Sequence, residues 1–298
     1  MRQKTRGFEM PPCTIAIIGG LAVSLVTVTD RVPEMGETLN AQSFTKHLGG
    51  KGANSAVTAY RASHLKPNDD NALPDISAED EDEIQVRMIG AVGDDEFGPL
   101  CIAKLEQTGV DISGIRTVEE QPTGVCVIIV ESDFGENRIL FTAGANLSLL
   151  PEDFLTLESL AGGVKPDLLI AQLEIPRETV EQILRTASMA GVDVLLNPAP
   201  AQYLLSSVYP TITHLVVNET EAALLSGRYM NEIASPEGWA SVTDEFLEKG
   251  VKNVVITLGA KGAYYSSAVG QGGHVEAEKD LDVVDTTGAG YVASVIAF

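Results

Sequence analysis

Short apolar runs separated by helix-length segments recur along this chain, and this order restricts its fold more than any other feature. The runs predict strands at Thr14–Ile18, Val86–Val92, Thr123–Val130, Leu168–Leu173, Val192–Leu196, His214–Val217 and Asn253–Leu258. Helices are predicted at Gly52–Leu65, Gly98–Thr108, Arg177–Ala190, Glu219–Ser226 and Pro236–Lys249. The runs are continuously apolar, as in strands buried on both faces. The order therefore predicts an α/β fold with a mostly parallel central sheet and right-handed crossovers.

Two stretches depart from this order. Residues 30–48 carry Pro33 and Gly36 and have a weak two-residue period in their second half, which predicts part of a small β lid beside the main sheet. Residues 67–83 hold eight carboxylates and two prolines, which predicts an acidic surface insertion. Because there is no long linker, residues 1–298 are predicted to form a single domain.

Charge and cysteine usage restrict the partners and the compartment. The formal net charge is -22, so phosphate backbones would be repelled and no nucleic-acid partner is expected. The longest apolar stretch near the N-terminus is too short to span a bilayer, and no membrane partner is expected. Three cysteines without metal-ligand spacing indicate reduced thiols. We therefore expect a cytoplasmic protein, with the nucleus as a second compartment.

The segment from Leu48 to Asn54, LGGKGAN, opens a predicted helix. Glycines let the backbone approach a ligand and present N–H groups at a helix N-terminus. Lys51 adds positive charge, and Asn54 can both donate and accept hydrogen bonds to hydroxyls. The spacing is not that of a P-loop. A tight turn without a ligand is the structural alternative.

Two more polar segments each follow a predicted strand. Asn218 and Glu221 lie three residues apart, a spacing that suits a helix capping box as well as a site for nucleotide phosphates and hydrated Mg²⁺. The segment 257–262, TLGAKG, turns through two glycines at another strand end and suits a hairpin turn equally well. Spacing alone leaves both pairs of interpretations open.

The segment 285–290, DTTGAG, follows a short apolar run. Successive backbone N–H groups at the start of a helix could form an anion hole there. Asp285 could cap that helix or hold a cation, and a helix cap alone is the structural alternative.

These segments together resemble the ribokinase branch of the PfkB family of sugar kinases. The resemblance runs from about Thr14 to Gly290. It rests on GGKGAN at 49–54, AVGDDEFG at 91–98, AGAN at 143–146, QLE at 172–174, NPAPA at 197–201, NETEA at 218–222, TLGAKG at 257–262 and VDTTGAG at 284–290. The acidic insertion resembles fungal members.

The resemblance implies a ribokinase-like three-layer sandwich and an ATP-dependent sugar kinase, most simply one that makes ribose 5-phosphate from ribose. It places at the sugar site Gly50, Lys51, Gly52, Ala53, Asn54 and Glu174, with Ala22 and Ser24 at two further sugar-contacting positions. It places at the ATP site Asn218, Glu221, Thr257, Leu258, Gly259, Ala260, Lys261 and Gly262. It implies Mg²⁺ with ATP, K⁺ held by Asp285 and Thr287, an anion hole at Gly288, Ala289 and Gly290, and a homodimer through the β lid.

Three departures from the family pattern stand out. The family's catalytic aspartate position is Tyr291, a phenol that is protonated near neutral pH and accepts a proton poorly. The family's sugar-contacting Asn and Asp positions are Ala22 and Ser24. Relatives continue with further helices, whereas eight residues follow Gly290 here, so we expect the C-terminal helices to be missing and the activity to be impaired. An intron read-through after Gly290 is a hypothesis that covers the first and third departures.

Three other functions compete with an active ribokinase. The chain could be a catalytically inactive homologue that still binds nucleotide or sugar, or a kinase for another sugar or a nucleoside. Gly288 to Ala293 fits a dinucleotide-binding fingerprint, but the βαβ unit and acidic residue that this fingerprint needs do not follow, so an oxidoreductase is rejected.

Overall fold

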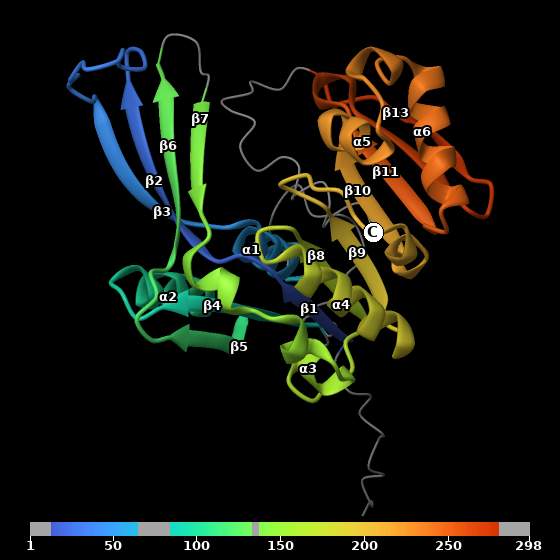
Figure 1. Cartoon of the computed structure of the whole chain (residues 1–298), viewed down its shortest axis with the longest axis horizontal. Coiled ribbons are helices and arrows are strands. Elements are labelled where there is room, and N and C mark those ends of the chain that lie inside the picture. The colour runs from blue at the N-terminus through green and yellow to red at the C-terminus, as the bar shows by residue number, and fades with distance from the viewer. Residues whose placement is uncertain (1–12, 65–83, 133–136, 280–298) are drawn as a thin grey trace, which may run out of the picture.

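Two sheets organise the chain, and they differ in size and in surroundings (Figure 1). The computed structural model describes residues 13–64, 84–132 and 137–279. The main sheet has nine strands in the order β13-β12-β11-β10-β9-β8-β1-β4-β5. Its strands are parallel from β11 to β5, and only β12 and β13 are antiparallel. The smaller sheet, here called the lid sheet, has the order β3-β2-β6-β7.

The elements have the following bounds. The main sheet contains β1 (Cys13–Ile18), β4 (Ile84–Gly93), β5 (Asp111–Val118), β8 (Leu168–Gln172), β9 (Asp193–Asn197), β10 (His214–Asn218), β11 (Asn253–Thr257), β12 (Ala263–Ser267) and β13 (Gly272–Val275). The lid sheet contains β2 (Ala22–Thr29), β3 (Ser43–Gly49), β6 (Gly124–Glu131) and β7 (Asn137–Thr142). The α-helices are α1 (Lys51–Ser63), α2 (Phe97–Thr108), α3 (Leu157–Ala161), α4 (Arg177–Met189), α5 (Glu219–Ser226) and α6 (Pro236–Glu248). Short 3₁₀ turns are η1 (Gly144–Ser148), η2 (Pro151–Phe154), η3 (Ser206–Thr211), η4 (Met230–Glu232) and η5 (Gly259–Lys261).

The main sheet is buried on both faces. Consecutive residues of β1 show this, because Ile17 packs with the cluster formed by α1 and α2, whereas Ala16 and Ile18 pack with the cluster that includes α4 and α6. All three side chains are fully buried. Continuous apolar runs are the sequence mark of strands covered on both sides, and the predicted α/β class with a mostly parallel sheet is confirmed. No helix in the described part of the chain is long and apolar enough to cross a membrane.

The lid sheet corrects two expectations. The run Thr123–Val130, which looked like a buried strand of the main sheet, is β6 in the lid sheet, where most of its side chains are only partly buried. Strands β2, β5, β7, β12 and β13 were not predicted at all. β7 is exposed along its whole length, so it lacks the apolar run on which the prediction depended. The expectation of a β element within residues 30–48 is met by β3, which begins at Ser43.

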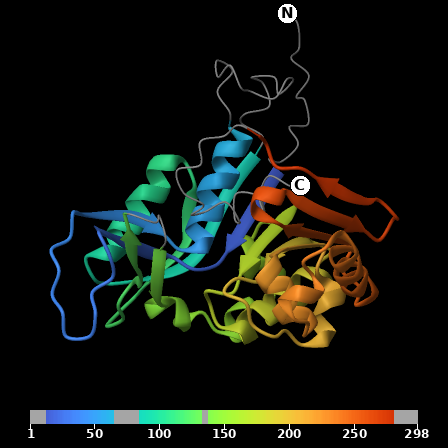
Figure 2. The ribbon, with the colours of Figure 1, turned by 90° about the horizontal axis from the view of Figure 1, so that it is seen from above.

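The lid sheet stands beyond the β1–β4 half of the main sheet, and the α5–α6 end lies on the opposite side of the molecule (Figure 1; Figure 2). β1 passes into β2 through only three residues, Gly19 to Leu21. The acidic insertion at 67–83 and the segment 285–291 lie outside the described residues, so the predictions for them remain predictions, as does the single-domain division.

Candidate active site

The topology of the main sheet predicts where a ligand would bind. β1 lies between β8 and β4, and the chain builds outward from it in both directions. In open parallel α/β sheets, ligands bind at the carboxyl ends of the strands where the strand order reverses in this way. Gly19 and Gly20 follow β1 at that point, and Glu174 follows β8. The N-terminus of α1 meets the same edge of the sheet.

Glycines allow the backbone to close around this point. A Cβ on Gly20 would lie 2.5 Å from Oε2 of Glu174, and one on Gly52 would lie 2.7 Å from the carbonyl carbon of Gly19. Gly50 has a φ of 89°, a left-handed conformation, and a Cβ there would lie 2.5 Å from the Gly20 carbonyl oxygen. The Gly49–Asn54 segment is therefore more than a tight turn, because its glycines let α1 and the β1–β2 junction come into direct contact.

Glu174 is a buried carboxylate with 8% of its surface exposed. The backbone N–H of Lys51, the first residue of α1, donates to its Oε2 at 2.5 Å. Burial raises the pKa of Glu174 above its ordinary value, and the Lys51 N–H and charge oppose that rise. A buried carboxylate lowers stability even when it accepts a hydrogen bond, so its presence at a strand end marks a candidate functional group.

Asn218 and Glu221 do form the capping box that their spacing suggested. The Asn218 N–H donates to Glu221 Oε2 at 2.9 Å, and the Glu221 N–H donates to Asn218 Oδ1 at 2.8 Å. Burial raises the pKa of Glu221, and the nearby Lys51 charge and the Asn197 side chain lower it. The capping role does not remove the carboxylate from the site, because this strand end lies on the same edge as Glu174.

The segment from Leu258 to Gly262 is also a hairpin turn, since it joins the antiparallel strands β11 and β12. Thr257 lies in register with Asn218, and its hydroxyl donates to the Val217 carbonyl at 3.4 Å. Lys261 forms an ion pair with Glu219, with 3.2 Å between Nζ and Oε1. A pocket of about 360 Å³ lies beside Lys261 and is lined by Trp239 and His274. The capping box and the hairpin turn are therefore both confirmed. The two segments place polar groups at the carboxyl edge of the sheet.

Lys51 connects the two halves of the site. Burial raises the pKa of Glu174, of Glu221 and of the Cys126 thiol, and the positive charge of Lys51 opposes that rise at all three groups. One cation thus acts on carboxylates that follow strands at different positions in the sheet. This arrangement suits a site that brings two ligands, or one ligand and a leaving group, close to one positive charge.

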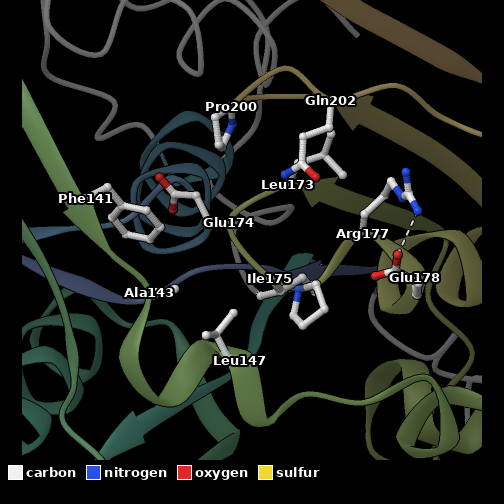
Figure 3. Close-up of a pocket in the computed structure, with 11 residues that line it drawn as sticks. Phe141, Ala143, Leu147, Leu173, Glu174, Ile175, Arg177, Glu178, Pro200 and Gln202 are labelled. Atoms are coloured by element: carbon white, nitrogen blue, oxygen red, sulfur yellow. Dashed lines mark hydrogen bonds and ion pairs between the residues drawn. The ribbon is translucent and has the colours of Figure 1, made fainter.

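Glu174 also lines a pocket of about 540 Å³ (Figure 3). Phe141 of the lid sheet and Pro200 of the loop after β9 lie on either side of the Glu174 carboxylate. The peptide bond between Ala199 and Pro200 is cis. The pocket therefore has contributions from both sheets, and the lid sheet forms part of its lining.

Several residues that shape the site were not singled out in the sequence. Asn146 is fully buried: its Nδ2 donates to the Leu21 and Ala143 carbonyls at 2.8 and 2.7 Å, and its Oδ1 accepts from the Leu21 N–H at 2.9 Å. It fixes the β1–β2 junction. The AGAN match contained it, and the QLE match contained Gln172, which donates to the Ser55 hydroxyl at 3.1 Å. No sequence signal marked Cys126 or Phe141.

The predicted residues fall into four groups. Gly50, Lys51, Gly52, Ala53 and Glu174 meet at the β1–β8 edge, with Asn54 in the first turn of α1. Asn218, Glu221 and the segment 257–262 lie along the same edge at β10 and β11. Ala22 and Ser24 are in the lid strand β2, where Ala22 is fully buried. Asp285, Thr287, Gly288, Ala289, Gly290 and Tyr291 lie outside the described residues.

A doubly covered parallel sheet with a lid sheet over glycines and carboxylates at its carboxyl edge defines a class of α/β enzymes that act on small molecules. The chain belongs to the pfkB family of carbohydrate kinases, whose model matches residues 14–297. It is therefore a phosphotransferase with a ribokinase-like fold.

Individual relatives agree with this family. The chain is 40% identical over 283 residues to a ribokinase of Schizosaccharomyces pombe, covering 93% of this chain and 81% of that protein. It is 34% identical over 278 residues to a deoxyribokinase of Salmonella typhi, covering 93% and 81%. The solved structure of Arabidopsis thaliana ribokinase, complexed with ribose and ATP, superposes with a TM-score of 0.76 at 26% identity, covering 96% of this chain and 84% of that one.

Proposed function

We propose that this chain is a ribokinase, which transfers the γ-phosphoryl group of ATP to the primary hydroxyl of D-ribose. The observation that carries the proposal is Glu174, a buried carboxylate held by the Lys51 N–H at the point where the strand order reverses. Such a group suits sugar hydroxyls, because a carboxylate accepts hydrogen bonds that a hydroxyl donates. The 40% identity to a ribokinase supports the same substrate.

In this proposal the two halves of the carboxyl edge bind the two substrates. The sugar lies between Glu174, Asn54 and the lid sheet, and Gly50 to Ala53 provide backbone contacts. ATP lies along β10 and β11, against Asn218 and the turn at 257–262. Lys51 lies between the two and offsets the charge of the group in transfer.

Two cations accompany ATP in this proposal. Mg²⁺ prefers phosphate and water oxygens plus one or two carboxylates, and the partly buried carboxylate of Glu221 fits that requirement. It would hold the ion's water shell, while Mg²⁺ supplies charge neutralisation to the phosphates. Asp285 and Thr287 would hold K⁺ and order the anion hole of Gly288, Ala289 and Gly290. The lid would mediate a homodimer, and reduced free cysteines fit the cytoplasm or nucleus.

We further propose that the chain is impaired in catalysis, because Tyr291 stands at the position of the family's proton acceptor. Loss of a general base typically lowers the rate by about 10²–10⁴. The test is ribose-dependent ADP formation with Mg²⁺ and K⁺, in the parent chain and in Tyr291→Asp. A large gain in Tyr291→Asp, absent in the exposed control Tyr229→Asp, is expected. A parent that already turns over like an ordinary kinase would refute the impairment while leaving the kinase assignment intact.

A kinase for another pentose is the second candidate. The 34% identity to a deoxyribokinase favours it. Comparing ribose with other pentoses and nucleosides in the same ADP assay separates the two candidates. Nucleotide binding without any phosphoryl transfer, in Tyr291→Asp as well, would instead identify an inactive binding homologue.

A further inference from the structure

The turn that joins β11 to β12 is built on two glycines in the left-handed region. Residues 258–262, here called the nucleotide turn, include Gly259 with a φ of 58° and Gly262 with a φ of 93°. The Leu258 N–H donates to the Gly262 carbonyl at 2.8 Å and closes the turn. Glycine loses more conformational freedom on folding than any other residue. A turn that contains two such glycines therefore depends on contacts from other elements to stay in one conformation.

Strand β13 supplies one such contact. The Nε2 atom of His274 lies 2.6 Å from the Lys261 carbonyl oxygen. Because a carbonyl only accepts hydrogen bonds, Nε2 carries the hydrogen and donates it. The two segments also touch directly, since a Cβ on Gly262 would overlap the Val275 carbonyl oxygen. His274 therefore ties the backbone of the nucleotide turn to the edge strand of the main sheet.

Trp239 of α6 supports this contact from the side of the helix. Trp239 is 5% exposed, and its ring lies 5.5 Å from the His274 ring at an angle of 27°. The Lys261 ammonium lies 5.8 Å from the centre of the same indole, within the range of a cation–π interaction. Tyr264 is paired directly with His274, and its ring centre lies 6.2 Å from that of Trp239. Because Glu219 of α5 pairs with the Lys261 ammonium, three elements meet on the nucleotide turn.

We infer that His274 is a positioning residue for the nucleotide, and that Trp239 holds its imidazole in place. The inference rests on the proposed function, in which ATP lies against the turn at 257–262. A turn that is already held in its binding conformation does not have to be ordered when the nucleotide binds. The loss of one hydrogen bond of this kind corresponds to a loss of affinity of about fivefold. The effect belongs to the nucleotide, since the proposed sugar site is at the other half of the carboxyl edge.

Binding calorimetry on the full chain tests this role without requiring catalysis. A non-hydrolysable ATP analogue is titrated with Mg²⁺ into the parent chain, into His274→Leu and into His274→Gln. His274→Leu removes the donor and is expected to bind the analogue about fivefold more weakly than the parent does. A glutamine amide replaces the Nε2 donor, so His274→Gln should stay within about twofold of the parent.

His47→Leu is the matched control. His47 is also an exposed histidine in an edge strand, β3 of the lid sheet, and its Nε2 lies 2.9 Å from the Thr45 hydroxyl. Its replacement should leave the affinity for the analogue unchanged. An unchanged affinity in His274→Leu, or an equal loss in His274→Gln or in His47→Leu, overturns the inference while the proposed function stands. A parent chain that does not bind the analogue overturns the proposed function itself, and the inference with it.

Tryptophan fluorescence gives a second readout that needs no variant. Trp239 is the only tryptophan of the chain, so its emission reports the surroundings of the nucleotide turn. Titration of the ATP analogue is expected to change this emission with the same Kd that calorimetry gives, whereas ribose alone should leave the emission unchanged. Emission that does not respond to bound analogue, or that responds equally to ribose alone, overturns the coupling between Trp239 and the nucleotide turn.

Discussion

The buried position of Glu174 disfavours the charged form of its carboxylate. Burial raises the pKa of this carboxylate above the ordinary value of about 4.3, so the folded chain binds the proton more tightly than the unfolded chain does. The buried charge of Glu174 therefore does not destabilise the folded chain at pH values below the ordinary pKa. Its destabilising effect develops as the pH rises through the folded-state pKa. The Lys51 N–H offsets only part of it.

Glu174→Gln should consequently stabilise the fold while abolishing sugar binding. We expect a gain of about 0.5–2 kcal/mol at neutral pH, within the range of stabilising changes at functional sites. The gain should shrink as the pH falls toward the ordinary pKa of a carboxyl. Urea unfolding at several pH values measures it, and a gain that is independent of pH would contradict the proposed cause.

Asn146 is the residue whose loss should damage the site without touching a ligand. Asn146→Ala leaves the buried N–H and C=O of Leu21 without their partner, which should cost about 2–4 kcal/mol in the free energy of unfolding. Asn253→Ala is a suitable control, because its Nδ2 makes longer bonds of 3.3 Å in a half-buried position. Equal losses in the two variants would show that Asn146 has no special role.

At the scale of elements, the junction between β3 and α1 depends on one backbone conformation. Gly50→Ala would place a methyl group against the Gly20 carbonyl and hold an alanine at a φ of 89°. We expect a loss of about 1–3 kcal/mol from the backbone strain, with a further loss from the contact. Thermal unfolding measures both together.

Gly36→Ala separates these two causes. Gly36 has a similar φ of 82°, but a Cβ there would meet nothing within 4 Å. It should therefore show the strain alone. If Gly36→Ala loses as much stability as Gly50→Ala, the contact with Gly20 contributes nothing.

The longer helices and the inner strands could be predicted from sequence, whereas α3 and the lid strands β2 and β7 could not. Helix α5 matches its predicted bounds, Glu219–Ser226, because a capping box begins it and Gly227 ends it in the left-handed region. The inner strands carry apolar runs because both of their faces are covered. A lid strand such as β7 has neither signal, since every residue in it is exposed.

The residues of the candidate site also divide into those that the sequence indicated and those that it did not. Its polar residues follow strands or open helices, and their motifs made them visible in the sequence. Cys126 and Phe141 become neighbours of Glu174 only through pairing between β6 and β7 and through the placement of the lid. Such contacts depend on the register of distant strands, which local patterns do not encode.

For the molecule as a whole, the lid sheet presents apolar side chains to solvent. Leu140 is 70% exposed and Ile139 is 52% exposed, and exposed apolar surface of this kind often marks a contact between proteins. If the lid mediates the proposed homodimer, Leu140→Asp should shift the chain toward monomer in sedimentation equilibrium. Val269→Asp changes an apolar residue that is 83% exposed in the β12–β13 turn and should have no effect. A parent chain that is monomeric at every protein concentration measured would exclude the homodimer.

The central pairing of the lid sheet also imposes an order of assembly. β2 pairs in parallel with β6 over eight positions, from Ala22 with Gly124 to Thr29 with Glu131. During synthesis, β2 therefore cannot pair with β6 until about a hundred further residues have been made. By that time β1, β4 and β5 are already available to pair with one another. Contacts between such distant positions form slowly. The lid sheet is thus expected to be the last part of the N-terminal half to become protected from hydrogen exchange during folding.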